Sequence, residues 1–114
     1  MNLPVEARAG LKIAAASGRI DHASSAAFAA ALEPLLPGCK SGSAPLVLDF
    51  SGVEYISSVG LRNLIVAHRR VTAQGGKLAV AAMQPLVWEI FTIARLNLIL
   101  PCYVDIDAAC ENLS

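Results

Sequence analysis

The stretch from residue 46 to residue 61 constrains the fold more than any other part of the chain. It begins with Leu46-Val47-Leu48, a continuous apolar run typical of a strand that is covered on both faces. We therefore predict a central strand here. The following segment, Asp49-Phe50-Ser51-Gly52, is rich in turn-forming residues, so it is expected to break the strand, and Val53 to Ile56 is expected to cross the end of the sheet.

Ser57-Ser58 opens the next element, a helix expected from about Ser58 to Ala73, with Gly75 suited to its C-terminal end. Two hydroxyls at a helix start lie among unpaired backbone N–H groups and at the positive end of the helix dipole. Such a position can hold a phosphate. It equally suits a serine that does no more than cap the helix.

The other elements alternate along the chain. Short antiparallel strands are predicted at residues 5–9 and 11–16, around Gly10, and further strands at 77–81 and 99–104. Helices are predicted at 23–36, 86–95 and 106–113, with Asp21 as the cap of the first. The order β-β-α-β-α-β-α-β-α predicts an α/β fold and a single domain over residues 1–114. Its central sheet would be mixed, partly parallel and of about five strands, with about four helices.

Apolar spacing predicts which side of each helix faces the core. In the helix at 23–36, the inward residues are expected to be Phe28, Leu32 and Leu35 or Leu36. In the helix at 86–95, they are expected to be Leu86, Ile90 and Ile93, which places Trp88 on the outward side.

The charge balance limits the kinds of partner. Nine basic and nine acidic residues give a net charge near zero, which argues against nucleic acid because phosphate-backbone binding depends on accumulated positive charge. Charged residues or prolines interrupt every apolar run before the roughly 20 residues of a membrane span. The first residues lack the pattern of a secretory signal, and the three cysteines have no close pairing typical of a zinc site or a disulfide framework. We therefore expect a cytoplasmic protein.

The helix that starts at Ser58 has an unusual outward face. Its inward side is apolar apart from His68. The residues that fall on the opposite side are Val59, Arg62, Asn63, Val66 and Arg70. Val59 and Val66 are apolar where a solvated face would be polar, as a partner-docking surface requires.

A catalytic role for Ser58 is not indicated. No G-x-S-x-G elbow surrounds it, and His68 falls on the opposite side of the same helix, which leaves only His22 as a base. The chain also lacks a G-x-x-x-x-G-K-[ST] phosphate loop. We therefore expect a protein that is not an enzyme and has no cofactor or metal of its own.

A longer pattern surrounds the serine pair. It runs Asp49-Phe50-Ser51-Gly52-Val53-Glu54-Tyr55-Ile56-Ser57-Ser58-Val59-Gly60-Leu61, with Gly18-Arg19-Ile20-Asp21 before it and Gly75-Gly76-Lys77-Leu78 after it. This pattern closely resembles the STAS domain family, which includes the bacterial anti-sigma factor antagonists. The resemblance covers nearly the whole chain, and its elements occur in a fixed order.

The resemblance implies regulation by partner switching, in which the antagonist binds an anti-sigma factor that is also a serine kinase and phosphorylation releases it. Ser58 falls at the phospho-acceptor position of the family's usual Asp-Ser-Ser/Thr-Gly-Leu signature, with Ser57 in place of the acid and Val59 in place of the second hydroxyl. ATP is expected on the partner kinase, and a phosphatase is a further possible partner. The expected partner-binding residues are Asp21, Ser57, Ser58, Val59, Arg62, Asn63, Val66 and Arg70.

The same resemblance supports an alternative. STAS-like proteins also act as accessory subunits of other complexes, including bacterial phospholipid-transport ABC systems. There the same helix surface would bind an ATPase subunit permanently, without phosphorylation. Ser57 in place of the acid slightly favours this alternative.

Overall fold

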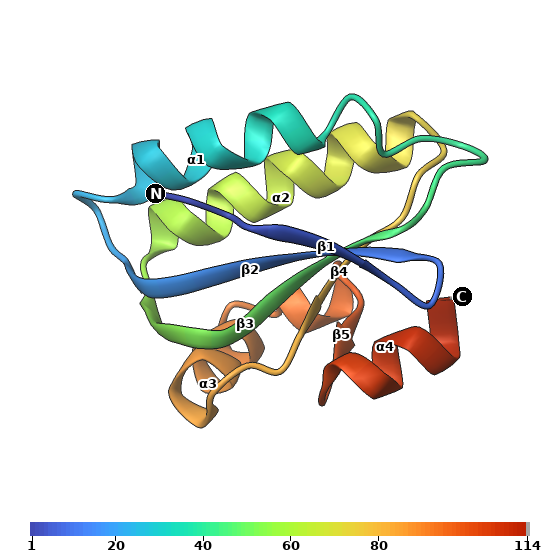
Figure 1. Ribbon diagram of the computed structural model, residues 1–114. Coiled ribbons are helices and arrows are strands. Elements are labelled where there is room, and N and C mark those ends of the chain that lie inside the picture. Colours follow the sequence, from blue (N-terminus) through green and yellow to red (C-terminus); the bar gives the residue numbers. More distant parts are fainter. Residues whose placement is uncertain (114) are drawn as a thin grey trace.

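A computed structural model describes residues 1–113, and its five strands form one sheet in the order β1-β2-β3-β4-β5 (Figure 1). The strands are β1 (Val5–Arg8), β2 (Leu11–Ile20), β3 (Leu46–Ile56), β4 (Leu78–Ala81) and β5 (Cys102–Tyr103). β1 pairs with β2 antiparallel, and all other neighbours pair in parallel. The predicted fold class and the order of elements are confirmed.

The helices are α1 (Ser25–Leu32), α2 (Ser58–Ala73), α3 (Pro85–Ile93) and α4 (Ile106–Leu113). α2 and α4 have the predicted bounds. The helix predicted at 23–36 is shorter, because Pro34 has no N–H to donate to the turn before it and the chain continues as a 3-10 turn at Glu33–Leu35. The strand predicted at 99–104 is also shorter, since a 3-10 turn at Leu96–Leu98 and Pro101 precede it.

The two faces of the sheet carry separate apolar cores. The larger core lies under α1, α2 and α3, which cover one face. It includes three buried phenylalanines in edge-to-face contact: ring centroids are 6.4 Å apart for Phe28 and Phe50, and 6.3 Å apart for Phe50 and Phe91. The smaller core packs α4 against the other face through Leu11, Ile13 and Ala109. In Figure 1, α1 and α2 run side by side, and α4 lies apart from them, next to β5.

The predicted break at residues 49–52 is wrong, because β3 continues through it to Ile56. Pairing with β2 shifts between Ala15 and Ser17 and again between Gly18 and Arg19, so β3 accommodates the extra residues as bulges. The Asp49 carboxylate accepts a hydrogen bond from the Ser51 N–H at 2.9 Å. The turn-forming residues therefore shape a bulged strand, and this strand leads directly to the start of α2.

The predicted inward face of α3 is wrong for Leu86 and Ile93, whereas Ile90 is partly buried and packs against the larger core, as predicted. Val87 and Phe91 are fully buried, whereas Leu86 is 50% and Ile93 is 75% exposed. Most residues of this short helix are apolar, so spacing alone does not choose between neighbouring stripes. The buried stripe is the one that brings the Phe91 ring against Phe50. Trp88 does lie outward, as predicted, and Phe28, Leu32 and Leu36 are buried as predicted.

Candidate partner-binding site

Ser57 joins the end of the sheet to α2. Its backbone N–H donates to the Ile20 carbonyl at 2.7 Å, which ties the start of α2 to the end of β2. Its side-chain oxygen accepts from the Gly60 N–H at 3.2 Å. Ser57 is therefore the N-cap of α2, and the capping role left open between the two serines belongs to Ser57.

Gly60 allows α2 to begin very close to the strand ends. A Cβ at this position would lie 2.8 Å from Ile20 Cγ2 and 2.8 Å from Ile56 Cγ1, closer than real side chains approach. The first turn of α2 therefore lies directly over β2 and β3, and Ser58 is held in place by a rigid support.

Ser58 is the first residue of α2, and it is exposed. Its hydroxyl makes no hydrogen bond to any group of residues 1–113. The backbone N–H groups of Ser58 and Val59 also have no acceptor in that range, whereas those of Gly60 and Leu61 are satisfied by Ser57. An anion attached to Ser58 would therefore meet free donors and the positive end of a 16-residue helix.

Asp21 lies beside this helix start, because it directly follows Ile20, the residue that binds Ser57. It is not the α1 cap that we predicted: the N-cap position of α1 is Ser24. The Asp21 carboxylate instead closes the preceding turn, since it accepts the Ser24 N–H at 3.0 Å. The backbone and side-chain hydrogen bonds from Ser24 lower the pKa of Asp21, so this carboxylate is ionised at neutral pH.

The outward face of α2 divides into open and engaged residues. Val59 is 36% and Val66 is 56% exposed, and Arg62 is exposed with no ion pair to residues 1–113. Two others bind α1 and the 3-10 turn after it: Asn63 Nδ2 donates to the Ser25 carbonyl at 2.8 Å, and Arg70 Nη1 donates to Glu33 at 2.6 Å. Val59, Arg62 and Val66 are therefore free for a partner, whereas Asn63 and Arg70 also hold the helices together.

Shallow hollows flank this face. One of about 250 Å³ lies between the start of α2 and the end of α3, and its lining includes Ser58, Tyr55, Ile90 and Ile93. Another of about 150 Å³ lies between α1 and α2, bordered by Arg62, Asn63 and Val66. Sequence reasoning missed Tyr55, Ile90 and Ile93 as part of the site, because it placed Ile90 and Ile93 in the core. No signal in the spacing could have placed Ile93 outward, because α3 is apolar on nearly all sides and the contact of Phe91 with Phe50 selects its buried face.

Within the described residues, no group of three or more His, Cys, Asp or Glu side chains could hold a metal ion. None of the helices in that range has the length and apolar character needed to cross a bilayer. His68 Nε2 lies 3.5 Å from Thr72 Oγ1 of the same helix. The features of the site are thus an accessible hydroxyl, free helix donors and exposed apolar side chains, which suit binding and modification.

The sequence of this domain matches a known family. The family model described as "Mlab, STAS domain" matches residues 8–101, and the chain belongs to the STAS domain family.

Named relatives are anti-sigma factor antagonists. BtrV of Bordetella bronchiseptica, assigned as such an antagonist, is 28% identical over 109 residues, which cover 96% of this chain and 91% of BtrV. The crystal structure of an anti-sigma factor antagonist from Mycobacterium paratuberculosis has a TM-score of 0.84 at 26% identity, covering 98% of this chain and 92% of that one.

SpoIIAA is a more distant neighbour. Its unphosphorylated form has a TM-score of 0.71 at 15% identity, covering 96% of this chain and 94% of that one. The phosphorylated form of the Bacillus protein has a TM-score of 0.64 at 14% identity, with 96% and 97% covered. At these identities the similarity concerns the fold alone.

Proposed function

We propose that this protein is an anti-sigma factor antagonist that binds an anti-sigma factor with serine kinase activity, and that phosphorylation of Ser58 inactivates it. The protein acts by binding in the cytoplasm and is not itself an enzyme, and ATP is bound by the kinase. Its relatives are named as antagonists, and SpoIIAA is known in phosphorylated and unphosphorylated forms.

One observation carries the proposal: the Ser58 hydroxyl is exposed and without a hydrogen bond to residues 1–113, while its neighbour Ser57 performs the capping. A serine that caps a helix has its oxygen engaged, and phosphorylation would disrupt the helix start. Ser58 can accept a phosphoryl group without that loss. The pair thus separates structural and regulatory roles.

A phosphate on Ser58 would act on the partner more than on the fold. It adds about −1.5 to −2 charges at neutral pH, and the free N–H groups of Ser58 and Val59 favour an anion at that place. The charge would nevertheless lie at the edge of the hollow that contains Tyr55 and Ile93. A partner whose apolar side chains fill this hollow would have to desolvate the phosphate, so its affinity falls.

Phosphorylation is tested with a candidate serine kinase, chosen from any that the gene neighbourhood encodes. The protein is incubated with this kinase and ATP, and its intact mass is measured; we expect a gain of about 80 Da, one phosphoryl group. Ser58→Ala should abolish the gain, and Ser57→Ala should retain it. A gain that persists in Ser58→Ala, or that maps to Ser57, would contradict the assignment.

A second candidate is an accessory subunit of another complex, such as a phospholipid-transport ABC system. The description of the matching family model, which names Mlab and not an antagonist, favours it, as does Ser57 in place of the usual acid. In that case the exposed face of α2 binds an ATPase subunit permanently. Copurification of such a subunit, together with no phosphorylation by any serine kinase encoded nearby, would favour this candidate over the first.

A further inference from the structure

A second concave surface lies away from Ser58, at the carboxyl ends of β4 and β5. It is a groove of about 460 Å³, lined by Met83, Pro85, Trp88, Cys102, Tyr103 and Val104. Met83 lies just after β4, and Cys102, Tyr103 and Val104 form and follow the neighbouring parallel strand β5. Pro85 and Trp88 belong to the first half of α3. The carboxyl ends of parallel strands are where α/β sheets commonly bind ligands, and the volume is in the range of roughly 300–1,000 Å³ found for small-molecule sites.

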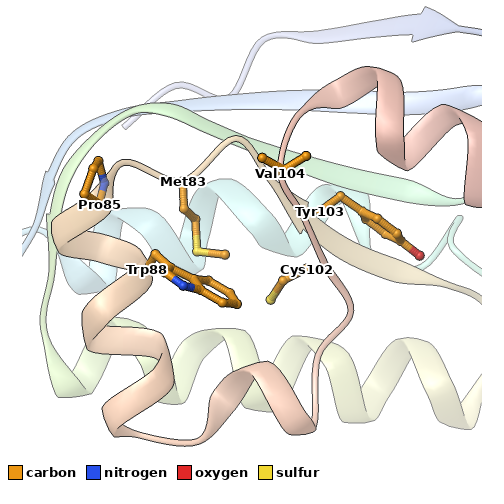
Figure 2. A pocket seen from close by; sticks show the side chains of 6 residues that line it. All are labelled: Met83, Pro85, Trp88, Cys102, Tyr103 and Val104. Atoms are coloured by element: carbon orange, nitrogen blue, oxygen red, sulfur yellow. The ribbon is translucent and has the colours of Figure 1, made fainter.

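The side chains of the groove form an apolar and polarisable lining. Figure 2 shows the thioether of Met83, the indole of Trp88 and the thiol of Cys102 converging on the same space, while the Tyr103 ring points away from it. Trp88 is 43% exposed, and its indole N–H makes no hydrogen bond to residues 1–113. An aromatic surface with sulfur atoms beside it favours a flat, apolar ligand, and the indole N–H can donate to one acceptor atom.

No charged side chain is among the residues that line the groove. The Cys102 thiol donates to the Leu100 carbonyl at 3.2 Å, and burial raises its pKa to about 11, so it is neutral at physiological pH. A charged ligand would therefore lose its hydration in this groove without gaining a counter-ion. A neutral ligand would not.

The backbone beside the groove is strained. Ala82, which directly follows β4, has a φ of 63°, a left-handed conformation that is unfavourable for alanine. Its N–H donates to the Tyr103 carbonyl at 3.1 Å, which fixes the ends of β4 and β5 together. The turn carries Met83 and Pro85 to the groove wall. Such strain is retained where the surrounding structure enforces it, and it is common at ligand sites.

We propose that this groove is a binding site for a small, neutral, planar aromatic molecule that stacks on Trp88. Nothing in the proposal depends on Ser58 or on the identity of the protein partner. Val104 lies at the rim, 82% exposed, and a bound ring would cover its side chain and the exposed face of the indole.

The test uses N-phenyl-1-naphthylamine, a neutral aromatic dye, with the purified chain. Trp88 is the single tryptophan, so dye bound in the groove should quench its emission by energy transfer while the dye emission rises. We expect saturation at one dye per chain. We also expect the anionic analogue 1-anilinonaphthalene-8-sulfonate to bind about tenfold more weakly or worse, because the groove offers no cation.

Two matched variants locate the dye. Val104→Asp places a carboxylate at the rim and should weaken binding about tenfold or more. Leu98→Asp introduces the same charge at a side chain that is 76% exposed but does not line the groove, and it should bind like the wild type. Far-UV circular dichroism and the melting temperature check that both variants fold.

Equal dye affinity in Val104→Asp and the wild type would overturn the proposal. So would equal weakening in both variants, tighter binding of the anionic dye, or non-saturating binding. If sedimentation instead shows that the free chain dimerises and that Val104→Asp, but not Leu98→Asp, makes it monomeric, the groove is a self-association surface and the ligand proposal is wrong.

Discussion

The hollow at Ser58 and the groove at Trp88 lie along the same nine-residue helix, α3, yet they differ in chemistry. The end of α3 contributes Ile90 and Ile93 to the hollow, and its start contributes Pro85 and Trp88 to the groove. The hollow adjoins the Ser58 hydroxyl and the first backbone N–H groups of α2, which have no hydrogen-bond partner among residues 1–113. The groove is nearly twice as large, about 460 against about 250 Å³, and no charged side chain lines it.

The difference arises from how each strand passes into the following helix. β3 leads into α2 through Ser57, which accepts the N–H groups of Gly60 and Leu61 but leaves those of Ser58 and Val59 without an acceptor among residues 1–113. β4 leads into α3 through the strained Ala82, and neither this turn nor the start of α3 brings a charged side chain into the groove. The hollow therefore borders a hydroxyl that can acquire a charge, whereas the described residues that line the groove are uncharged. A negative charge should act on a different binding event at each site: on the protein partner at the hollow and on the neutral ligand at the groove.

The largest expected effect is on partner binding when a charge is placed at each site. Ser58→Asp should weaken binding to the anti-sigma factor by roughly a hundredfold, about 3 kcal/mol, because the partner must desolvate the new carboxylate. Val104→Asp should leave that affinity within about threefold of the wild type, because it lies in the groove. Titration calorimetry with the purified partner measures both.

The comparison fails if the two aspartate substitutions weaken partner binding equally, or if Ser58→Asp binds the partner like the wild type. Ser58→Ala is the control for loss of the hydroxyl, and it should bind normally. The melting temperature should not fall in Ser58→Asp, since an acid in the first turn of a helix is favourable.

The next effect concerns the support of the hollow. Gly60→Ala should lower the free energy of unfolding by about 1–3 kcal/mol, because the new methyl group would overlap Ile20 and Ile56, both buried. Gly38→Ala is the matched control: nothing lies within 4 Å of a Cβ added there and the φ of Gly38 is not positive, so we expect no loss of stability. Urea unfolding measures both. Equal stability of the two variants would show that the first turn of α2 can move away from the sheet.

Much of this architecture could be predicted from the sequence because it depends on strong local signals. The Ser57-Ser58 pair and Gly75 placed α2 correctly, and the alternation of apolar runs along the chain placed α4. Spacing along α2 also separated Val59 and Val66 from the buried Leu64 and Val71, because that helix has a polar side and an apolar side.

The errors lie where local signals conflict with contacts between distant residues. Asp49 to Gly52 has turn composition, but β2 on one side keeps the segment in the sheet as a bulge. α3 is apolar on nearly all sides, so only packing of Phe91 against Phe50 selects its buried face. The groove and the part of the hollow formed by α3 both depend on that choice, and neither was predictable from spacing.

A smaller effect separates the two serines. Ser57→Ala removes the acceptor of the Gly60 N–H and should lower the free energy of unfolding by about 1 kcal/mol. Ser58→Ala should change stability by less than about 0.5 kcal/mol, because its hydroxyl is exposed and makes no hydrogen bond within the described part of the chain. Thermal unfolding of the two variants gives the comparison. The reverse order of stability would mean that Ser58 is the cap, and it would remove the main support for its regulatory role.

The smallest expected effect is a gain in stability at Arg95, which follows α3 at the end nearest the hollow. Arg95 has a φ of 58°, a left-handed conformation that costs an arginine more than a glycine. Arg95→Gly should therefore raise the free energy of unfolding by roughly 0.5–1 kcal/mol. Arg95→Ala removes the same charge but keeps the strain, so it should show no such gain. Arg69→Gly, in the interior of α2, is the opposite control: it should lower the free energy of unfolding by about 1 kcal/mol, since glycine is unfavourable where the backbone is helical. If Arg95→Ala gains as much as Arg95→Gly, charge and not backbone strain destabilises the end of α3.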